Sequence, residues 1–471
     1  MKPTNKTKQS IVGMTLALTG VCYAFLPAGC QESSQERRIS ISQGSSDAVS
    51  PVMLYRRCWK LINDLFYDQT FNGQNWQRWE HHYDGKIKTS DDAYKAIETM
   101  LASLGDPYTR FLNPEAFMDE KNQISAHLFG VGIQLGMSDL KKVVVIAPIH
   151  GSPAFNAGVL PGDEIIEVDG KIIAGQSLDT VVKQIRGPID SEVKLTMLRD
   201  GKRITLNLKR AEIPIKAVTK AVILPGNIGY IRLDSFISVK APQEVREALE
   251  KVESADGLIL DLRNNPGGLL DNSVQIANMF LQGGIIVSTK DSAEHVRPTM
   301  ASGNPIYNKP IVTLVNEGSA SAAEILAAAL KDNQRATLVG DKTFGKGLVQ
   351  AIQKLDDGSG MNFSIARYLT AGGADIHKKG VHPNIKVTLS IDDYKAGIGP
   401  WWIDPKFRRF NREPTDGYDL ALLRAINAMK NELNSARGIP AEPFDEAKVK
   451  KEVLEKLASL SPAKPSSEAT P

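Results

Sequence analysis

Residues 311–350 read IVTLVNEGSASAAEILAAALKDNQRATLVGDKTFGKGLVQ. The β-branched run Ile311–Val315 predicts a buried strand. A polar turn with Gly318 follows, and the Ala-, Leu- and Glu-rich run after it predicts a helix that starts near Ser321. A second apolar run, residues 336–339, predicts another buried strand. This pattern is typical of an α/β sheet in which strands and helices alternate along the chain.

The predicted turn places a serine at a helix N-terminus. Unpaired N–H groups and the helix dipole favour negative charge there, which suits the oxyanion of an acyl transfer. Ser321 is therefore a candidate nucleophile, although such a small-residue run more often starts a helix with a capping serine. A base is also needed, and none of the seven histidines can be tied to Ser321. Lysine is the other known partner, when burial leaves its amine neutral.

Lys346 suits the role of the base. It lies between Gly345 and Gly347, which allow a close backbone approach, and it follows the aromatic Phe344. Gln350 lies four residues later in a predicted strand, where it could hold the lysine amine. Taken alone, Lys346 would be interpreted as a solvated loop lysine.

Together these residues resemble the carboxyl-terminal processing proteases, also called tail-specific proteases, which are Ser/Lys-dyad serine endopeptidases. The resemblance implies that Ser321, rather than Ser319, is the nucleophile. It also implies that Lys346, which follows 25 residues later, is the base and that Gln350 assists it.

The resemblance includes the upstream run LILDLRNNPGGLL, residues 258–270. In the family this segment supplies a backbone N–H to the oxyanion hole. That role falls on Gly267 here, with Ala322 supplying the second N–H. The resemblance covers residues from about 50 to 390.

A second motif lies inside the same stretch. Residues 340–346 read G-x-x-x-x-G-K after a predicted strand, which is most of a phosphate-binding loop. The next residue is Gly347 instead of Ser or Thr, so the hydroxyl that would bind magnesium is missing. The run LVQAIQKL that follows predicts a strand and not the required helix. We therefore expect neither a nucleotide nor a metal cofactor.

Residues 127–211 predict short strands and turns, and the run AGVLPGD at 157–163 resembles a PDZ domain. Such domains bind an extended peptide as an added strand and hold its terminal carboxylate on loop N–H groups. Leu135 could belong either to the groove or to the core. Val181 or Val182 would lie opposite. The candidate peptide-binding residues are Phe129, Gly130, Val131, Gly132 and Ile133.

The first residues predict export. Three lysines precede the apolar run at 11–26, which is typical of a secretory signal and short for a spanning helix. The run ends at Pro-Ala-Gly-Cys, which resembles a bacterial lipoprotein signal with Cys30 as the lipidated residue. Pro27 stands where that motif usually has leucine. Cleavage without lipidation and an uncleaved anchor are the alternatives.

Composition adds two constraints. Cys58 is the one cysteine beyond the predicted signal, so we expect no internal disulfide. The net charge of +3 arises from 57 basic and 54 acidic residues and gives no argument for nucleic-acid binding.

We expect a multi-domain α/β protein, with the aromatic residues of 104–112 serving in packing. The expected segments are a signal peptide (1–29), a linker (30–50), an N-terminal helical region (51–126), a PDZ domain (127–211), a serine protease catalytic core (212–390), a C-terminal helical region (391–460) and a disordered tail (461–471).

The resemblance implies an exported serine endopeptidase on the periplasmic side of the bacterial cell envelope, lipid-anchored to a membrane. Its expected partners are unfolded or tail-exposed proteins bound by their C-termini, and the resemblance leaves room for an activating adaptor and a homo-oligomer. A non-enzymatic PDZ scaffold is the rival class, and the joint presence of Ser321, Lys346 and Gln350 argues against it. A plant-type lumenal enzyme that processes a photosystem subunit is disfavoured by the short signal.

Overall fold

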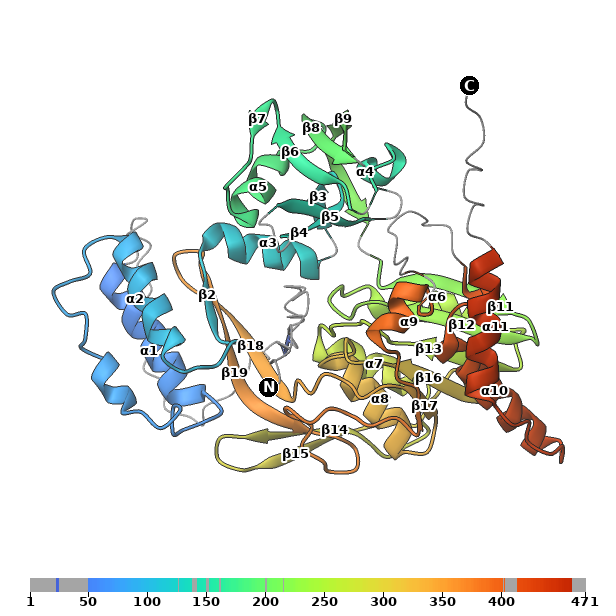
Figure 1. Ribbon diagram of the computed structural model, residues 1–471. Helices are drawn as coiled ribbons and strands as arrows, with labels where there is room; N and C mark the ends of the chain where they lie inside the picture. Colours follow the sequence, from blue (N-terminus) through green and yellow to red (C-terminus); the bar gives the residue numbers. More distant parts are fainter. Residues whose placement is uncertain are drawn as a thin grey trace, which may run out of the picture.

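The computed structural model describes residues 23–24, 50–125, 127–137, 142–149, 152–160, 162–199, 201–214, 216–400, 402 and 413–459. Cys30, most of the predicted signal and linker, and the predicted tail lie outside the described residues. Figure 1 shows an N-terminal helical region, a small β-rich domain above it, and a larger α/β region that carries the C-terminal helices. The mixed α/β class predicted from the sequence is confirmed.

A six-stranded sheet forms the core of the α/β region, in the order β11-β12-β13-β16-β17-β20. All neighbours are parallel except β11, which pairs antiparallel with β12. The central strands are buried along their whole length, as expected when helices cover both faces. The strands are β11 (Val218–Leu224), β12 (Ile228–Leu233), β13 (Gly257–Asp261), β16 (Ile311–Val315), β17 (Thr337–Gly340) and β20 (Ile385–Lys386).

Helices cover both faces of this sheet. On β13, Leu258 and Leu260 pack with the helices α6 (Ala241–Lys251), α7 (Leu270–Asn278) and α8 (Ala322–Asp332). Ile259 points the other way, because side chains alternate along a strand, and it packs with α10. The elements on this second side are α9 (Ile391–Ala396), η2 (Pro414–Asp416), α10 (Leu420–Ala436) and α11 (Glu446–Ser459).

A second six-stranded sheet links the α/β region to the N-terminal part of the chain. Its longest pair is the antiparallel β18 (Leu348–Lys354) and β19 (Gly360–Leu369), which lies between the two parts in Figure 1. From the N-terminal region, β2 pairs antiparallel with β19. The remaining strands are β1 (Tyr23–Ala24), β2 (Arg110–Leu112), β14 (Ile285–Asp291) and β15 (Val296–Met300).

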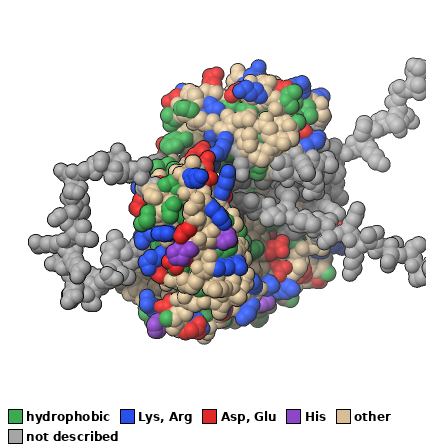
Figure 2. All heavy atoms as spheres, turned by 90° about the vertical axis from the view of Figure 1, so that its left-hand side faces the viewer, with side chains coloured by type: hydrophobic (Ala, Val, Ile, Leu, Met, Phe, Trp, Pro, Cys, Tyr) green, Lys and Arg blue, Asp and Glu red, His purple; other side chains and the backbone are tan. Residues whose placement is uncertain are grey.

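The N-terminal region is largely helical, as the sequence predicts, but it also contributes β2. Its core is rich in aromatic side chains and includes Phe363 of β19 and the buried free thiol of Cys58. Figure 2 shows basic and acidic side chains interspersed over the outer face of this region. Its helices are α1 (Pro51–Leu65), η1 (Trp76–Trp79), α2 (Ser90–Ala102) and α3 (Pro114–Ile124).

The β-rich domain has the five-stranded order β4-β5-β6-β8-β9, with β7 paired to β6. β4 is an edge strand, and α5 lies against it. Where the chain enters and leaves this domain, β3 pairs antiparallel with β10 in a separate ladder. The elements are β3 (His127–Gly130), β4 (Ile133–Met137), β5 (Val143–Pro148), α4 (Pro153–Asn156), β6 (Glu164–Val168), β7 (Lys171–Ile172), α5 (Leu178–Ile185), β8 (Glu192–Arg199), β9 (Lys202–Lys209) and β10 (Ala211–Pro214).

Among the described residues, no helix is both long enough and apolar enough to cross a membrane.

Candidate active site

Two turns meet at one edge of the central sheet. Residues 264–268 follow β13, and residues 316–320 follow β16. Because β13 and β16 are parallel neighbours, both turns leave the sheet at the same end. They are also bonded to each other, since the Asn264 N–H donates to Asn316 Oδ1 at 2.8 Å and Asn316 Nδ2 donates to Asn264 Oδ1 at 2.7 Å.

Ser321 stands at the N-cap position of α8 with φ +59°, a left-handed backbone conformation that is rare for a non-glycine residue. Its side chain is fully buried, and Oγ has no hydrogen-bond partner among the described residues. The hydroxyl of Ser319, in contrast, donates to the Leu262 carbonyl at 2.8 Å and accepts from the Asn316 N–H at 3.0 Å. Of the two serines in the motif, Ser321 therefore has the hydroxyl that the fold leaves unused.

Glu324, one turn into α8, connects the serine to the lysine loop. Its Oε2 accepts from the backbone N–H groups of Ser321 and Lys346, both at 2.8 Å. Its Oε1 accepts from the Gly345 N–H at 2.7 Å and from Thr343 Oγ1 at 2.5 Å. The backbones of the predicted nucleophile and the predicted base are thus held by the same carboxylate oxygen.

The carboxylate of Glu324 is fully buried. Burial raises its pKa above the usual glutamate value, while the four donors act in the opposite direction by stabilising the ionised form. Glu324 is not among the site residues predicted from the sequence. A glutamate three residues after a helix-starting serine is the capping-box pattern, which was the available signal.

Lys346 lies in the loop just before β18, where it is 2% exposed. The flanking glycines allow another segment to pack against this loop. A Cβ on Gly345, which has φ +93°, would lie 2.8 Å from the Gly380 nitrogen, and one on Gly347 would lie 2.8 Å from the His377 nitrogen. Burial in general disfavours the ammonium form of a lysine, and a lysine that acts as a general base needs the neutral amine.

Tyr108 also reaches this site, although the sequence analysis assigned the aromatic residues of 104–112 to packing. Its ring centroid lies 4.4 Å from Lys346 Nζ, and its carbonyl oxygen accepts from Gln350 Nε2 at 2.5 Å. Gln350 is fully buried on β18, and its Oε1 has no hydrogen-bond partner among the described residues. Tyr108 could not be identified from the sequence, because a local pattern does not show which distant residues the tyrosine ring will contact.

Gly267 packs directly against the serine. It has φ +96°, and a Cβ there would lie 2.8 Å from Ser321 Cβ and 2.9 Å from the Ala322 nitrogen. Only glycine fits this position. Its N–H donates to Asn265 Oδ1 at 2.9 Å, so this predicted oxyanion donor is engaged within its own turn. Ala322 is the first residue of α8, where backbone N–H groups have no partner within the helix.

A buried ion network lies directly before this turn. Arg263 makes charge-assisted hydrogen bonds to Asp261, at the end of β13, and to Asp419, the N-cap of α10. Burial alone would raise the pKa of Asp261, but Arg263 outweighs it and lowers that pKa. Tyr230 completes the network by donating to Asp261 Oδ2 at 2.8 Å.

The predicted peptide-binding residues lie at the start of the β-rich domain. Phe129, which is 41% exposed, and Gly130 belong to β3, while Ile133 begins β4. Val181 of α5 is fully buried in the domain core, whereas Val182 is half-buried. Val131 and Gly132 form the connection between the two strands.

Two ion pairs connect this domain to the region around the candidate site. Lys183 of α5 lies 3.0 Å from Glu115 of α3, and Arg186, the C-cap residue of α5, pairs with Asp119 of α3. The helix beside the edge strand β4 is therefore in contact with the segment that follows β2.

Residues 340–346 do not have the structural context of a phosphate-binding loop. The run after Lys346 is β18, a strand, where a phosphate-binding loop would need a helix.

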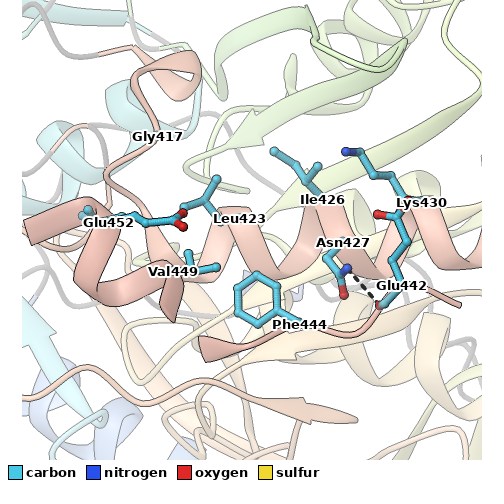
Figure 3. A pocket seen from close by; sticks show the side chains of 10 residues that line it. Gly417, Leu423, Ile426, Asn427, Lys430, Glu442, Phe444, Val449 and Glu452 are labelled. Atoms are coloured by element: carbon cyan, nitrogen blue, oxygen red, sulfur yellow. Dashed lines mark hydrogen bonds between the residues drawn. The ribbon is translucent and has the colours of Figure 1, made fainter. Parts of the chain in front are cut away.

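A separate pocket of about 360 Å³ lies between α10, α11 and the segment around Phe444 (Figure 3). Leu423 and Val449 supply apolar walls, and the Asn427 side chain donates to the Glu442 carbonyl at its rim. It shares no residue with the site around Ser321.

Comparison with known proteins identifies the family of this chain. The family model described as "Peptidase family S41" matches residues 227–387, and the model described as "PDZ domain" matches residues 130–209. A carboxyl-terminal-processing protease from Synechocystis sp. is 42% identical over 356 residues, which cover 74% of this chain and 83% of that protein. The chain belongs to the carboxyl-terminal processing proteases of peptidase family S41. It is therefore a serine peptidase.

Two further members of this protease family support the assignment. A carboxy-terminal processing protease from Bacillus subtilis is 40% identical over 310 residues, covering 64% of this chain and 66% of that protein. A solved structure, a photosystem II D1 C-terminal processing protease, has a TM-score of 0.54 and 36% identity, and covers 72% of this chain and 93% of that one.

We predict that Glu324→Gln lowers the free energy of unfolding by about 2–6 kcal/mol, because a carboxamide offers one acceptor oxygen where the site presents two pairs of donors. Chemical unfolding of the full chain measures this. Glu317→Gln, an exposed change in the preceding turn, should stay within about 0.5 kcal/mol of the parent. Equal stability of the two variants would contradict the proposed importance of this carboxylate.

Proposed function

We propose that this protease cleaves polypeptides near their C-termini with a Ser/Lys dyad, in which Ser321 is the nucleophile and Lys346 the general base. The observation that carries the proposal is the buried Oγ of Ser321, which has no hydrogen-bond partner in the described part of the chain and whose backbone shares Glu324 with that of Lys346. Ser319 is a poorer candidate for the nucleophile, because its hydroxyl already donates a hydrogen bond to the Leu262 carbonyl.

The reaction follows from these groups. Ser321 Oγ attacks the scissile carbonyl carbon, and its proton passes to the neutral amine of Lys346. The resulting ammonium protonates the leaving amine as the C–N bond breaks, which leaves an ester on Ser321. Lys346 then takes a proton from water, and the hydroxide attacks the ester carbonyl carbon. The lysine ammonium returns that proton to Ser321 Oγ as the ester C–O bond breaks, which releases the new carboxyl end and restores the serine. Gln350 Oε1 is buried and has no hydrogen-bond partner within the described ranges, so it is suited to hold the lysine amine.

The oxyanion of the tetrahedral intermediate would be held by the N–H groups of Ala322 and Gly267. The Ala322 N–H opens α8, where the helix dipole also favours negative charge. The Gly267 N–H would exchange Asn265 Oδ1 for the oxyanion. In the described arrangement, one of the two donors therefore has to be released before catalysis.

Substrate capture would use the PDZ domain. The edge strand β4 can accept an extended tail beside α5, and the connection at Val131 and Gly132 can hold the terminal carboxylate. Phe129, Gly130 and Ile133 flank that connection. Unfolded or tail-exposed proteins of the cell envelope are the proposed substrates.

The residues near the N-terminus support export to the periplasmic side of the bacterial envelope, with Cys30 as a lipid anchor. The Gly267 N–H, one of the two oxyanion donors, is engaged by Asn265 in the described arrangement. Binding of an activating adaptor, or assembly into a homo-oligomer, could release this donor, so both fit the same proposal.

Ser321→Ala should reduce cleavage of an unfolded protein with an apolar C-terminus by roughly 10³-fold or more. Ser319→Ala should largely spare cleavage, because that hydroxyl is bonded within the turn. Mass spectrometry of the products measures both variants and locates the cuts. The reverse order would identify Ser319 as the nucleophile, and equal cleavage by parent and Ser321→Ala would remove the dyad.

Amidation of the substrate's terminal carboxylate should raise the apparent KM by about tenfold or more, because the loop loses a charged hydrogen-bond partner. Steady-state cleavage of matched peptides measures this effect. A peptide with an internal carboxylate amidated instead serves as the control. If both peptides behave alike, the PDZ domain recognises something other than the chain end.

Cys30→Ser should move the protein from the membrane fraction to the soluble fraction of the exporting cell, because serine cannot carry the thioether lipid. Cys22→Ser, which changes the other cysteine of the predicted signal, should leave the distribution unchanged. Membrane association that survives Cys30→Ser would argue against lipidation.

A further inference from the structure

Tyr108 joins the N-terminal region to the candidate active site by two contacts. Its ring faces Lys346 Nζ at 4.4 Å, and its carbonyl oxygen accepts a hydrogen bond from Gln350, a residue 242 positions away in the chain. One residue of the N-terminal region therefore touches both the predicted base and the residue predicted to assist it.

The position of this tyrosine is fixed by its own loop. Asp106 Oδ2 accepts from Thr109 Oγ1 at 2.7 Å and from Ser364 Oγ of β19 at 2.8 Å. Two residues after Tyr108, the chain enters β2, which pairs with β19. The ring is thus held against Lys346 by bonds on both sides of it.

An aromatic face attracts a cation through its quadrupole, and the attraction grows when water is excluded. At Lys346 this contact favours the ammonium, whereas burial favours the neutral amine. The two effects oppose each other on the same nitrogen. The ring therefore limits how far burial can lower the proton affinity of the lysine.

Other titratable groups face this pair of residues. Burial raises the pKa of Tyr108 itself, so its phenol stays neutral near neutral pH. Burial lowers the pKa of His377, whose backbone packs on Gly347. The other titratable groups near the pair, among the described residues, include Glu324 on α8, Asp106 in the tyrosine loop and Tyr368 on β19, whose hydroxyl donates to the Lys346 carbonyl.

We propose that Tyr108 is a positioning residue that sets the proton affinity of Lys346, so that the N-terminal region completes the catalytic base. This inference rests on the proposed Ser/Lys function. It assigns the ring a role in the pH range of activity in addition to its packing.

The test is the pH profile of kcat/KM for the full chain. Activity requires the neutral amine, so it rises as the pH passes the pKa of the base. Tyr108→Leu keeps an apolar side chain but removes the ring, and it should move the midpoint of the acid limb to lower pH by about 0.5–1 unit. Tyr108→Trp, with a stronger quadrupole, should move it to higher pH. Tyr108→Phe is the matched control and should leave it in place.

The melting temperature of each variant is measured to separate this effect from a loss of folding. A purely structural role of Tyr108 would change Tm and the amount of active enzyme but would not move the midpoint of the acid limb. An unchanged midpoint in Tyr108→Leu, or shifts of one sign in all three variants, would overturn the inference. Ser321→Ala is assayed alongside. If that variant cleaves like the parent, the dyad itself is wrong, whereas an inactive Ser321→Ala with unmoved Tyr108 midpoints rejects the role of Tyr108 alone.

Discussion

The site depends on one buried carboxylate. Glu324 accepts four hydrogen bonds, from the start of its own helix and from the loop between β17 and β18. A buried carboxylate is costly unless such donors replace water, and here every donor belongs to one of the two segments that carry the predicted dyad. The buried carboxylate thus holds the backbones of Ser321 and Lys346 close together, although Ser321 Oγ has no hydrogen-bond partner among the described residues.

A second buried charge supports the other side of the site. Arg263 immediately precedes the turn that packs on Ser321, and it is held between Asp261 and Asp419. Removing Arg263 would leave two carboxylates in the interior without the cation that they share, which is far more costly than the intact network. Because Asp419 also caps α10, the C-terminal helices contribute to the geometry of an active-site turn on the opposite side of the sheet.

The remaining parts of the chain reach the same site from other directions. The N-terminal region supplies Tyr108 through a loop bonded to β19, and it supplies α3, whose ion pairs connect it to α5 of the PDZ domain. Lys346 therefore lies against the N-terminal region, which is in turn ion-paired with the PDZ domain.

The sequence by itself determined the strand–turn–helix pattern around Ser321, the glycines beside Lys346 and the spacing of the motif residues. These features are local, because period, propensity and the need for glycine act between neighbours in the chain. The tertiary structure decided the rest: the sharing of Glu324, the approach of Tyr108 to Lys346, the pairing of β2 with β19 and the engagement of the Gly267 N–H by Asn265. Each of these depends on where a distant segment packs or on which acceptor a turn presents, and a one-dimensional pattern does not specify either.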